Sequence, residues 1–154
     1  FWGWATLSPG EPFSQGSPYE NQKVKKIAVV MTDGDNLAFG GSNTGASTPG
    51  NWHWHNASDY QAYGFLSRNR LGTTNKDVAK GKINEKMLTI CQKMKSKGIE
   101  IYSVIVQVPD QAARDAFRAC ASRSSNYFEI SDATKQKEAF RTIAVQIGRL
   151  RLTH

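Results

Sequence analysis

Residues 26–36 read Lys-Ile-Ala-Val-Val-Met-Thr-Asp-Gly-Asp-Asn and contain the clearest structural signal of this chain. Its apolar run is rich in β-branched residues, which predicts a strand buried on both faces of a parallel sheet. The run stops at Asp33 and Asp35, with Gly34 between them to let the backbone turn sharply. Ligands of open α/β sheets bind just beyond the carboxyl ends of the strands, and carboxylates there suit a divalent cation such as Mg²⁺. The alternative is an Asp-Gly turn that only ends the strand.

Length and charge narrow the class of protein. The 154 residues suit one domain, and the net charge of +7 is spread along the chain rather than clustered. This distribution favours a solvated basic surface over a nucleic-acid site. No apolar run approaches the roughly 20 residues that span a bilayer. The chain starts at Phe1 without a signal-peptide pattern, so we expect a fragment or processed product whose export signal or membrane anchor lies upstream.

Hydrophobic spacing predicts the order strand, long loop, helix, strand, helix, strand, helix. Right-handed crossovers then make neighbouring strands parallel and place successive helices on one face of the sheet. The predicted pieces are an irregular, tryptophan-anchored segment 1–22, strands at 25–32, 99–108 and 127–130, and a loop at 37–82. The predicted inward helix positions are Met87, Ile90, Cys91 and Met94, then Ala113, Ala116, Phe117 and Cys120, then Phe140, Ile143, Ala144 and Ile147. Gly98 is expected to end the first helix, Asp110 to cap the second, and Ser131 or Asp132 to cap the third.

The long loop concentrates aromatic side chains beside the end of the first strand. It contains Trp52 and Trp54, which alternate with His53 and His55, and it continues to Tyr60 and Tyr63. Two histidines on one side of an extended segment are a possible Zn²⁺ or Cu²⁺ pair, but no third ligand has a recognisable spacing. The pattern favours aromatics that pin the loop. If they are exposed instead, Trp and Tyr suit contacts with a protein or glycan.

The chain has two cysteines, Cys91 and Cys120, and each falls on the inward side of a predicted helix. Two such positions suit buried free thiols in a reducing compartment or one disulfide in an oxidising one. Their spacing alone leaves both alternatives open.

Several short motifs follow one another along nearly the whole chain. They are Trp2-Gly3-Trp4, Leu7-Ser8-Pro9, Met31-Thr32-Asp33-Gly34-Asp35-Asn36, Tyr60-Gln61-Ala62-Tyr63-Gly64, Cys91 ahead of Lys97-Gly98, Ile101-Tyr102, Gln107-Val108-Pro109-Asp110, Cys120-Ala121-Ser122 and Arg149-Leu150-Arg151-Leu152. In this order they resemble the TadG-like family of bacterial tight-adherence (Tad/Flp) pilus-assembly proteins. More narrowly, they resemble the C-terminal part of the von Willebrand factor A (vWA) domain in that family.

The resemblance implies the C-terminal half of a three-layer, Rossmann-like α/β fold over residues 1–154, with mainly parallel strands and flanking helices. Asp33 matches an aspartate of a metal-ion-dependent adhesion site. The Asp-x-Ser-x-Ser loop and the threonine that complete that site do not occur here. We therefore expect Mg²⁺ or another divalent cation to bind tightly only in the complete domain. The missing half would also supply the strand beside the first strand, so this chain alone would expose a hydrophobic edge.

The family implies a non-enzymatic domain that binds a protein of the pilus-assembly machinery. Asp35, Asn36, Trp52, Trp54, Tyr60 and Tyr63 are its candidate contact residues. The family also implies a periplasmic setting and an anchor in the inner membrane, which favours a Cys91–Cys120 disulfide.

An enzyme is the main alternative function. Asp33 and Asp35 have the spacing of the nucleophile and general acid in a haloacid-dehalogenase-type phosphatase that uses Mg²⁺. Such an enzyme also needs a Ser or Thr at the end of the next strand, and the sequence there is Gln107-Val108-Pro109-Asp110. A basic nucleic-acid-binding domain is a further alternative, but it lacks a recognisable motif.

Overall fold

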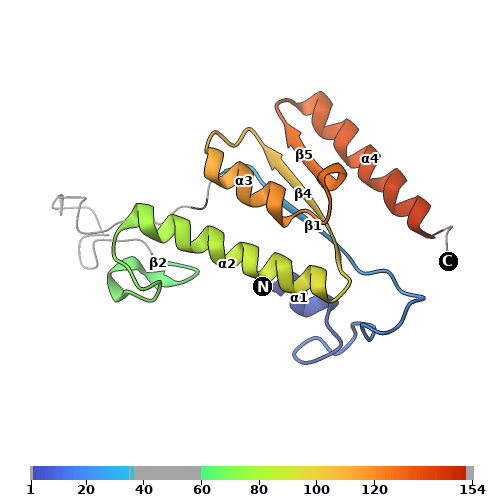
Figure 1. Cartoon of the computed structure of the whole chain (residues 1–154), viewed down its shortest axis with the longest axis horizontal. Helices are drawn as coiled ribbons and strands as arrows, with labels where there is room; N and C mark the ends of the chain where they lie inside the picture. Colours follow the sequence, from blue (N-terminus) through green and yellow to red (C-terminus); the bar gives the residue numbers. More distant parts are fainter. Residues whose placement is uncertain (1, 35, 37–59, 152–154) are drawn as a thin grey trace. The chain divides into compact units, whose positions relative to one another are not determined.

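The computed structural model describes residues 2–34, 36 and 60–151 (Figure 1). The chain divides into two compact units. One comprises Phe1–Asp35 and Met87–His154, and the other comprises Asn36–Lys86. Helix α2 (Lys76–Ser96) begins in the second unit and ends in the first. We describe each unit separately.

The larger unit contains a three-stranded parallel sheet in the order β1-β4-β5. The strands are β1 (Ile27–Thr32), β4 (Glu100–Val106) and β5 (Tyr127–Ile130). In the register, Val29 lies opposite Tyr102 and Val104 lies opposite Phe128. The predicted α/β class and the parallel arrangement of neighbouring strands are therefore confirmed.

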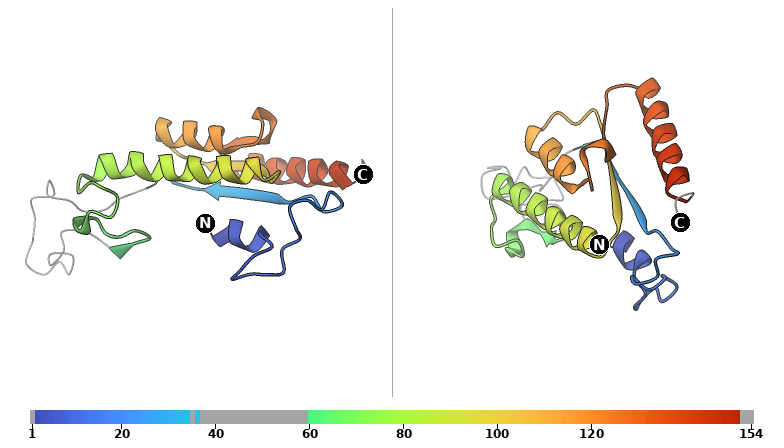
Figure 2. Two further views of the ribbon diagram at one scale, coloured as in Figure 1. Left: turned by 60° about the horizontal axis from the view of Figure 1, so that its bottom comes forward. Right: turned by 45° about the vertical axis from the view of Figure 1, so that its right-hand side comes forward.

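Helices cover both faces of this sheet, as the right-hand view of Figure 2 shows. The end of α2 and helix α3 (Gln111–Cys120) lie on one face, and α4 (Ala133–Arg151) lies on the other. The first face is built from Ala28, Val30, Ile101 and Ile105 with Cys91, Met94, Ala113 and Phe117. The second is built from Tyr102, Val104 and Ile130 with Ala139 and Ile143. The layers are helix, sheet and helix, with α2 and α3 on the same face as predicted.

Local signals set the end of α2 and the start of α3 where the sequence predicts them. Gly98 has φ 74°, and the amides of Gly98 and Ile99 donate to the carbonyls of Lys95 and Met94. This geometry satisfies carbonyls at the end of α2 and favours glycine in the left-handed region. Asp110 caps α3, with its Oδ2 accepting from the Ala113 amide at 2.9 Å. All four predicted inward residues of α3 are buried.

Strand β1 differs from its prediction as a strand buried on both faces. Val29 is 45% exposed and Met31 is 49% exposed. The cause is position, because β1 is at the edge of the sheet and α4 packs over β4 and β5. The edge strand of the sheet therefore carries two exposed apolar side chains.

Helix α4 also differs from its prediction, because its buried stripe is rotated. Ala139 and Ile143 are buried and Ile147 is partly buried, whereas Phe140 is 40% exposed and Ala144 is exposed. Both stripes have helical spacing, so periodicity alone could not choose between them.

The N-terminal segment is more regular than predicted. It opens with α1 (Trp2–Leu7) and continues through turns. Trp4 is partly buried and packs against the cluster around Cys91. Trp2 is 65% exposed, with its ring 6.2 Å from that of Phe13. Trp4 therefore anchors the segment to the core as predicted, whereas Trp2 is mostly exposed and contacts Phe13 within the segment.

The smaller unit has its own short hairpin and apolar cluster, within the segment that the sequence predicted to be loop. Strands β2 (Tyr60–Gln61) and β3 (Gly64–Phe65) are antiparallel, and the 3-10 helix η1 (Leu66–Arg68) follows. Leu66, Leu71 and Ala79 form the buried cluster. Helix α2 begins at Lys76 because the Asn75 side chain accepts from the Asp77 and Val78 amides.

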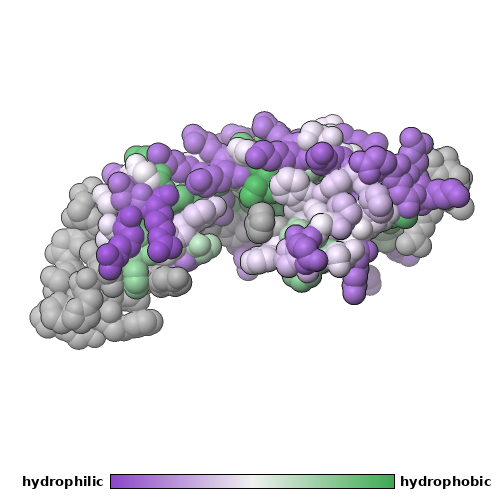
Figure 3. Space-filling view, turned by 90° about the horizontal axis from the view of Figure 1, so that it is seen from below, coloured by the Kyte–Doolittle hydropathy of each residue, from purple (hydrophilic) through white to green (hydrophobic). Residues whose placement is uncertain are grey.

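The face in Figure 3 is mostly hydrophilic over the described residues, with small separate hydrophobic areas. Among the described helices, none combines the length and apolar content that crossing a bilayer requires.

Candidate functional site at the carboxyl edge of the sheet

The turn after β1 presents Asp33 to solvent. The Thr32 hydroxyl donates to the Gly34 carbonyl at 2.8 Å and accepts from the Gly34 amide at 3.3 Å. These contacts close a tight turn, so the chain bends as soon as the strand ends. A Cβ on Gly34 would lie in open space, and Gly34 is outside the left-handed region. The sharp turn is present as predicted, but it is closed by the Thr32 side chain and does not use the left-handed conformation that glycine favours.

The ends of β4 and β5 are tied to each other. The Gln107 amide donates to the Ile130 carbonyl, and Gln107 Nε2 donates to the Ser131 carbonyl, both at 2.9 Å. Gln107 has φ 52°, a conformation that is rare outside glycine. These bonds hold the two loops that follow β4 and β5 in one arrangement.

The carboxylates of those two loops act as helix caps. Asp110 caps α3, and Asp132 Oδ1 accepts from the Lys135 amide at 3.0 Å. Ser131 Oγ also lies 2.9 Å from Asp132 Oδ2. The Lys135 amide, followed by the Ser131 hydroxyl, lowers the pKa of the Asp132 carboxyl. Both carboxylates therefore serve the fold, whereas Asp33 follows an edge strand and caps no helix of the described chain.

The described residues contain no group of three or more His, Cys, Asp or Glu side chains placed to hold a metal ion. Asp33 is therefore a candidate metal ligand by itself and not a member of a cluster among the described residues. Asp35, the other carboxylate of the motif, lies outside the described residues, as do His53 and His55.

The candidate contact residues from Asn36 onward belong to the smaller unit. Asn36 Nδ2 donates to Asn84 Oδ1 at 2.7 Å. Tyr63 is half-buried against the Leu66 cluster, and Lys86 Nζ lies 5.9 Å from the centre of its ring. Tyr60 begins β2. Trp52 and Trp54 lie outside the described residues. The contacts of Asn36 and Tyr63 are thus within their own unit.

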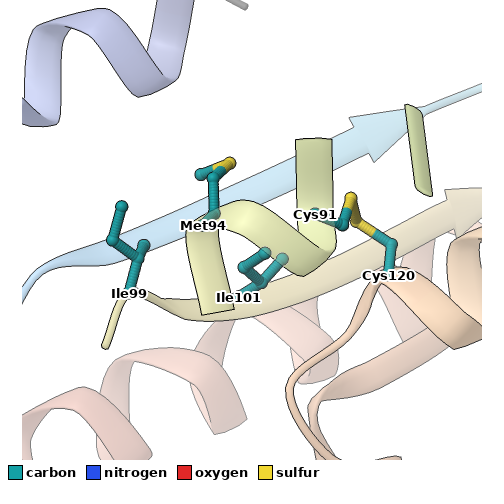
Figure 4. Packing of buried hydrophobic residues seen from close by; sticks show 5 residues of the cluster. All are labelled: Cys91, Met94, Ile99, Ile101 and Cys120. Atoms are coloured by element: carbon teal, nitrogen blue, oxygen red, sulfur yellow. A yellow bond between two sulfur atoms is a disulfide. The ribbon is translucent and has the colours of Figure 1, made fainter. Parts of the chain in front are cut away.

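The two cysteines form a disulfide between α2 and α3 (Figure 4). Their Cα atoms are 5.2 Å apart, and both residues are buried in a cluster with Met94, Ile99 and Ile101. This finding confirms the Cys91–Cys120 pairing, and the described residues include no free cysteine.

A polar network at the opposite, amino edge of the sheet was not anticipated from the sequence. Buried Asn126 donates to Glu100 Oε1 at 3.0 Å, and Arg123 forms an ion pair with the same oxygen. Lys95 Nζ donates to the Ala119 carbonyl at 2.8 Å. A hollow of about 360 Å³ lies here, lined by Lys25, Lys95, Gly98, Ile99, Glu100, Ser122 and Arg123. The available signal was Glu100 at the start of an otherwise apolar strand, because a buried carboxylate needs partners.

No protein-family model, curated protein or solved structure matches this chain.

Proposed function

We propose that this chain is the C-terminal part of a vWA-type interaction domain from a bacterial tight-adherence pilus-assembly protein. Its activity is to hold a protein partner at the carboxyl edge of the sheet. The observation that carries the proposal is the exposed Asp33 directly after β1, the edge strand of a parallel sheet flanked by helices. That position and the sequence Thr32-Asp33-Gly34 agree with the metal aspartate of the TadG-like resemblance.

The proposed role is non-enzymatic because the polar side chains in the loops after β4 and β5 bind backbone groups of the protein itself. Asp110 and Asp132 are bound to backbone amides at the starts of α3 and α4. A phosphatase of the haloacid-dehalogenase type would need a hydroxyl at the end of β4, where Gln107 instead binds the loop after β5. These contacts favour a binding surface over an acid–base site.

The disulfide supports an exported protein. Cys91–Cys120 is buried and joins two helices, as expected of a structural cross-link in an oxidising compartment. We place the domain in the periplasm, with an anchor in the inner membrane supplied by an upstream part of the parent protein.

Metal titration tests the proposed role of Asp33. We expect this chain to bind Mg²⁺ or Mn²⁺ weakly, because one carboxylate makes an incomplete coordination shell. In a longer protein that carries an Asp-x-Ser-x-Ser loop, Asp33→Ala should abolish metal-dependent partner binding and leave the circular dichroism spectrum unchanged. Asp115→Ala, on the exposed side of α3, is the matched control. Micromolar metal binding by this chain alone, with hydrolysis of a phosphomonoester that Asp33→Ala removes, would contradict the proposal and favour the phosphatase.

The proposed partner surface includes Trp52, Trp54, Tyr60 and Tyr63. Truncating an aromatic contact residue at an interface often costs about 2 kcal/mol or more of binding free energy. Trp52→Ala and Trp54→Ala should therefore weaken partner binding and leave the melting temperature near that of wild type. Trp2→Ala is the control, because Trp2 is an exposed tryptophan in the other unit. A lower melting temperature with unchanged partner affinity would assign Trp52 and Trp54 to the fold.

A further inference from the structure

We propose that the hollow at the amino edge of the sheet binds a phosphate group, as inorganic phosphate or a phosphate monoester. This inference is independent of the proposed function, which concerns the opposite edge. Three cationic side chains line the hollow: Lys25 precedes β1, Lys95 lies in the last turn of α2 and Arg123 precedes β5. Against one carboxylate, that of Glu100, these three cations leave two positive charges. A phosphate monoester has a charge of about −1.5 to −2 near neutral pH, so its charge matches that of the hollow.

Two of these cations are held in place before a ligand arrives. Arg123 forms an ion pair through Nη2, and its Nε donates to Asn126 Oδ1 at 3.1 Å. These contacts use two of the five N–H groups of the guanidinium. Lys95 Nζ donates to the Ala119 carbonyl at 2.8 Å and to the Ala121 carbonyl at 3.3 Å, which uses two of its three N–H groups. A phosphate group therefore meets fixed donors, and little side-chain entropy is lost on binding.

The hollow also has donors that the protein itself leaves unused. Lys25 is exposed and, over the described residues, forms no hydrogen bond or ion pair. Ser122 Oγ accepts from the Ile101 amide at 2.8 Å, and its O–H has no acceptor within the described part of the chain. A Cβ built on Gly98 would meet no atom within 4 Å, so the space in front of this residue is open. An anion in this space can accept from Lys25 and Ser122 without breaking an existing contact.

Two features of the hollow oppose an anion, and the protein compensates both. The Glu100 side chain is only 9% exposed, and its ion pair with Arg123 offsets its negative charge. The carbonyl ends of α2 and α3 also lie at this edge, and the C-terminus of a helix favours cations. Lys95 covers the end of α3, and backbone amides bind carbonyls at the end of α2. Lys25 is therefore the cation whose charge is most available to a ligand.

NMR titration of the whole chain with sodium phosphate at constant ionic strength tests the site. We expect the backbone amides of Gly98, Ser122 and Arg123 to shift together, with a dissociation constant of about 1 mM. Lys25→Ala should weaken binding about tenfold, because it removes a hydrogen bond to a charged group, and should leave the melting temperature unchanged. Lys137→Ala removes the same charge from an exposed lysine of α4 and should leave phosphate binding unchanged. Acetate should bind more weakly than phosphate, because it has a single negative charge.

Flotation with lipid vesicles separates two sources of the phosphate group. If vesicles of phosphatidylcholine with phosphatidic acid capture the protein, and Lys25→Glu but not Lys137→Glu releases it, the ligand is a lipid headgroup. If capture fails, or both variants reduce it alike, while inorganic phosphate still binds, the ligand is a soluble phosphate. Phosphate binding that is absent, no tighter than that of acetate, or weakened equally by Lys25→Ala and Lys137→Ala would overturn the proposal.

Discussion

Lys26 shows how one charged residue anchors the N-terminal segment. Its side chain is buried, and its ammonium donates to the carbonyls of Leu7 and Ser17. It also lies over the Tyr19 ring, 4.9 Å from the centre, and the Tyr19 hydroxyl accepts from Trp4 Nε1 at 2.9 Å. A buried lysine is costly unless it is paired, so this set of contacts is what permits Lys26 to lie buried directly before β1.

Lys26→Ala should therefore destabilise the protein, because it leaves the Leu7 and Ser17 carbonyls without their donor. We expect a loss of about 1–3 kcal/mol in the free energy of unfolding, measured by urea denaturation. Lys23→Ala, at an exposed lysine three residues earlier, should change it by less than about 0.5 kcal/mol. Similar losses for both variants would show that the anchor is not specific to Lys26.

Asp132 should make the stability of α4 depend on pH. Hydrogen bonds from the Lys135 amide and the Ser131 hydroxyl lower the folded-state pKa of its carboxyl below the ordinary value of 3.8. The stabilisation is therefore fully present above that ordinary value and is lost as the pH falls through the lowered folded-state pKa. Asp132→Asn should be less stable than wild type near neutral pH and equally stable in strong acid. A stability difference that persists unchanged below pH of about 2 would contradict this assignment.

At the scale of elements, the disulfide fixes the end of α2 against the end of α3. It joins residues separated by 29 positions, which on the chain-entropy model stabilises the protein by about 3 to 4 kcal/mol. Because either single substitution breaks the cross-link, Cys91→Ala should cost nearly as much as Cys91→Ala with Cys120→Ala. Thiol counting on denatured, unreduced protein from an oxidising compartment should find no free thiol. Two free thiols per chain, or fully additive losses, would contradict the cross-link.

At the scale of the whole molecule, the two compact units should respond separately to damage in their cores. Leu71 is buried in the smaller unit and Ile143 is buried in the larger one. Truncating either residue to alanine should lower the free energy of unfolding of the unit that contains it by about 2–5 kcal/mol. Native-state hydrogen exchange should show that Leu71→Ala lowers protection in residues 60–86 and spares the β4 amides, with the reverse for Ile143→Ala. An equal loss of protection in both units after Leu71→Ala would show that they unfold as one.

Strands β1, β4 and β5 and helices α3 and α4 could be predicted from the sequence because their signals are local, whereas α1, the β2–β3 hairpin and the start of α2 were missed. Continuous apolar runs rich in β-branched residues mark the strands, helical spacing marks α3, and Gly98 and Asp110 mark the end of α2 and the start of α3. The position of Asp33 at the carboxyl end of a strand follows from the same local signals. The cysteine pairing needed the family resemblance, since two inward helix positions alone left the thiol state open.

The tertiary structure decided what each element faces. It made β1 an edge strand with Val29 and Met31 exposed, and it buried Ala139 of α4 in place of Phe140. It also selected Asp132 rather than Ser131 as the cap of α4, whereas the predicted cap of α3, Asp110, is confirmed. A residue pattern contains the period of a helix or strand, but burial depends on which other element lies above it. That contact joins residues far apart in the chain, so only the packed structure determines it.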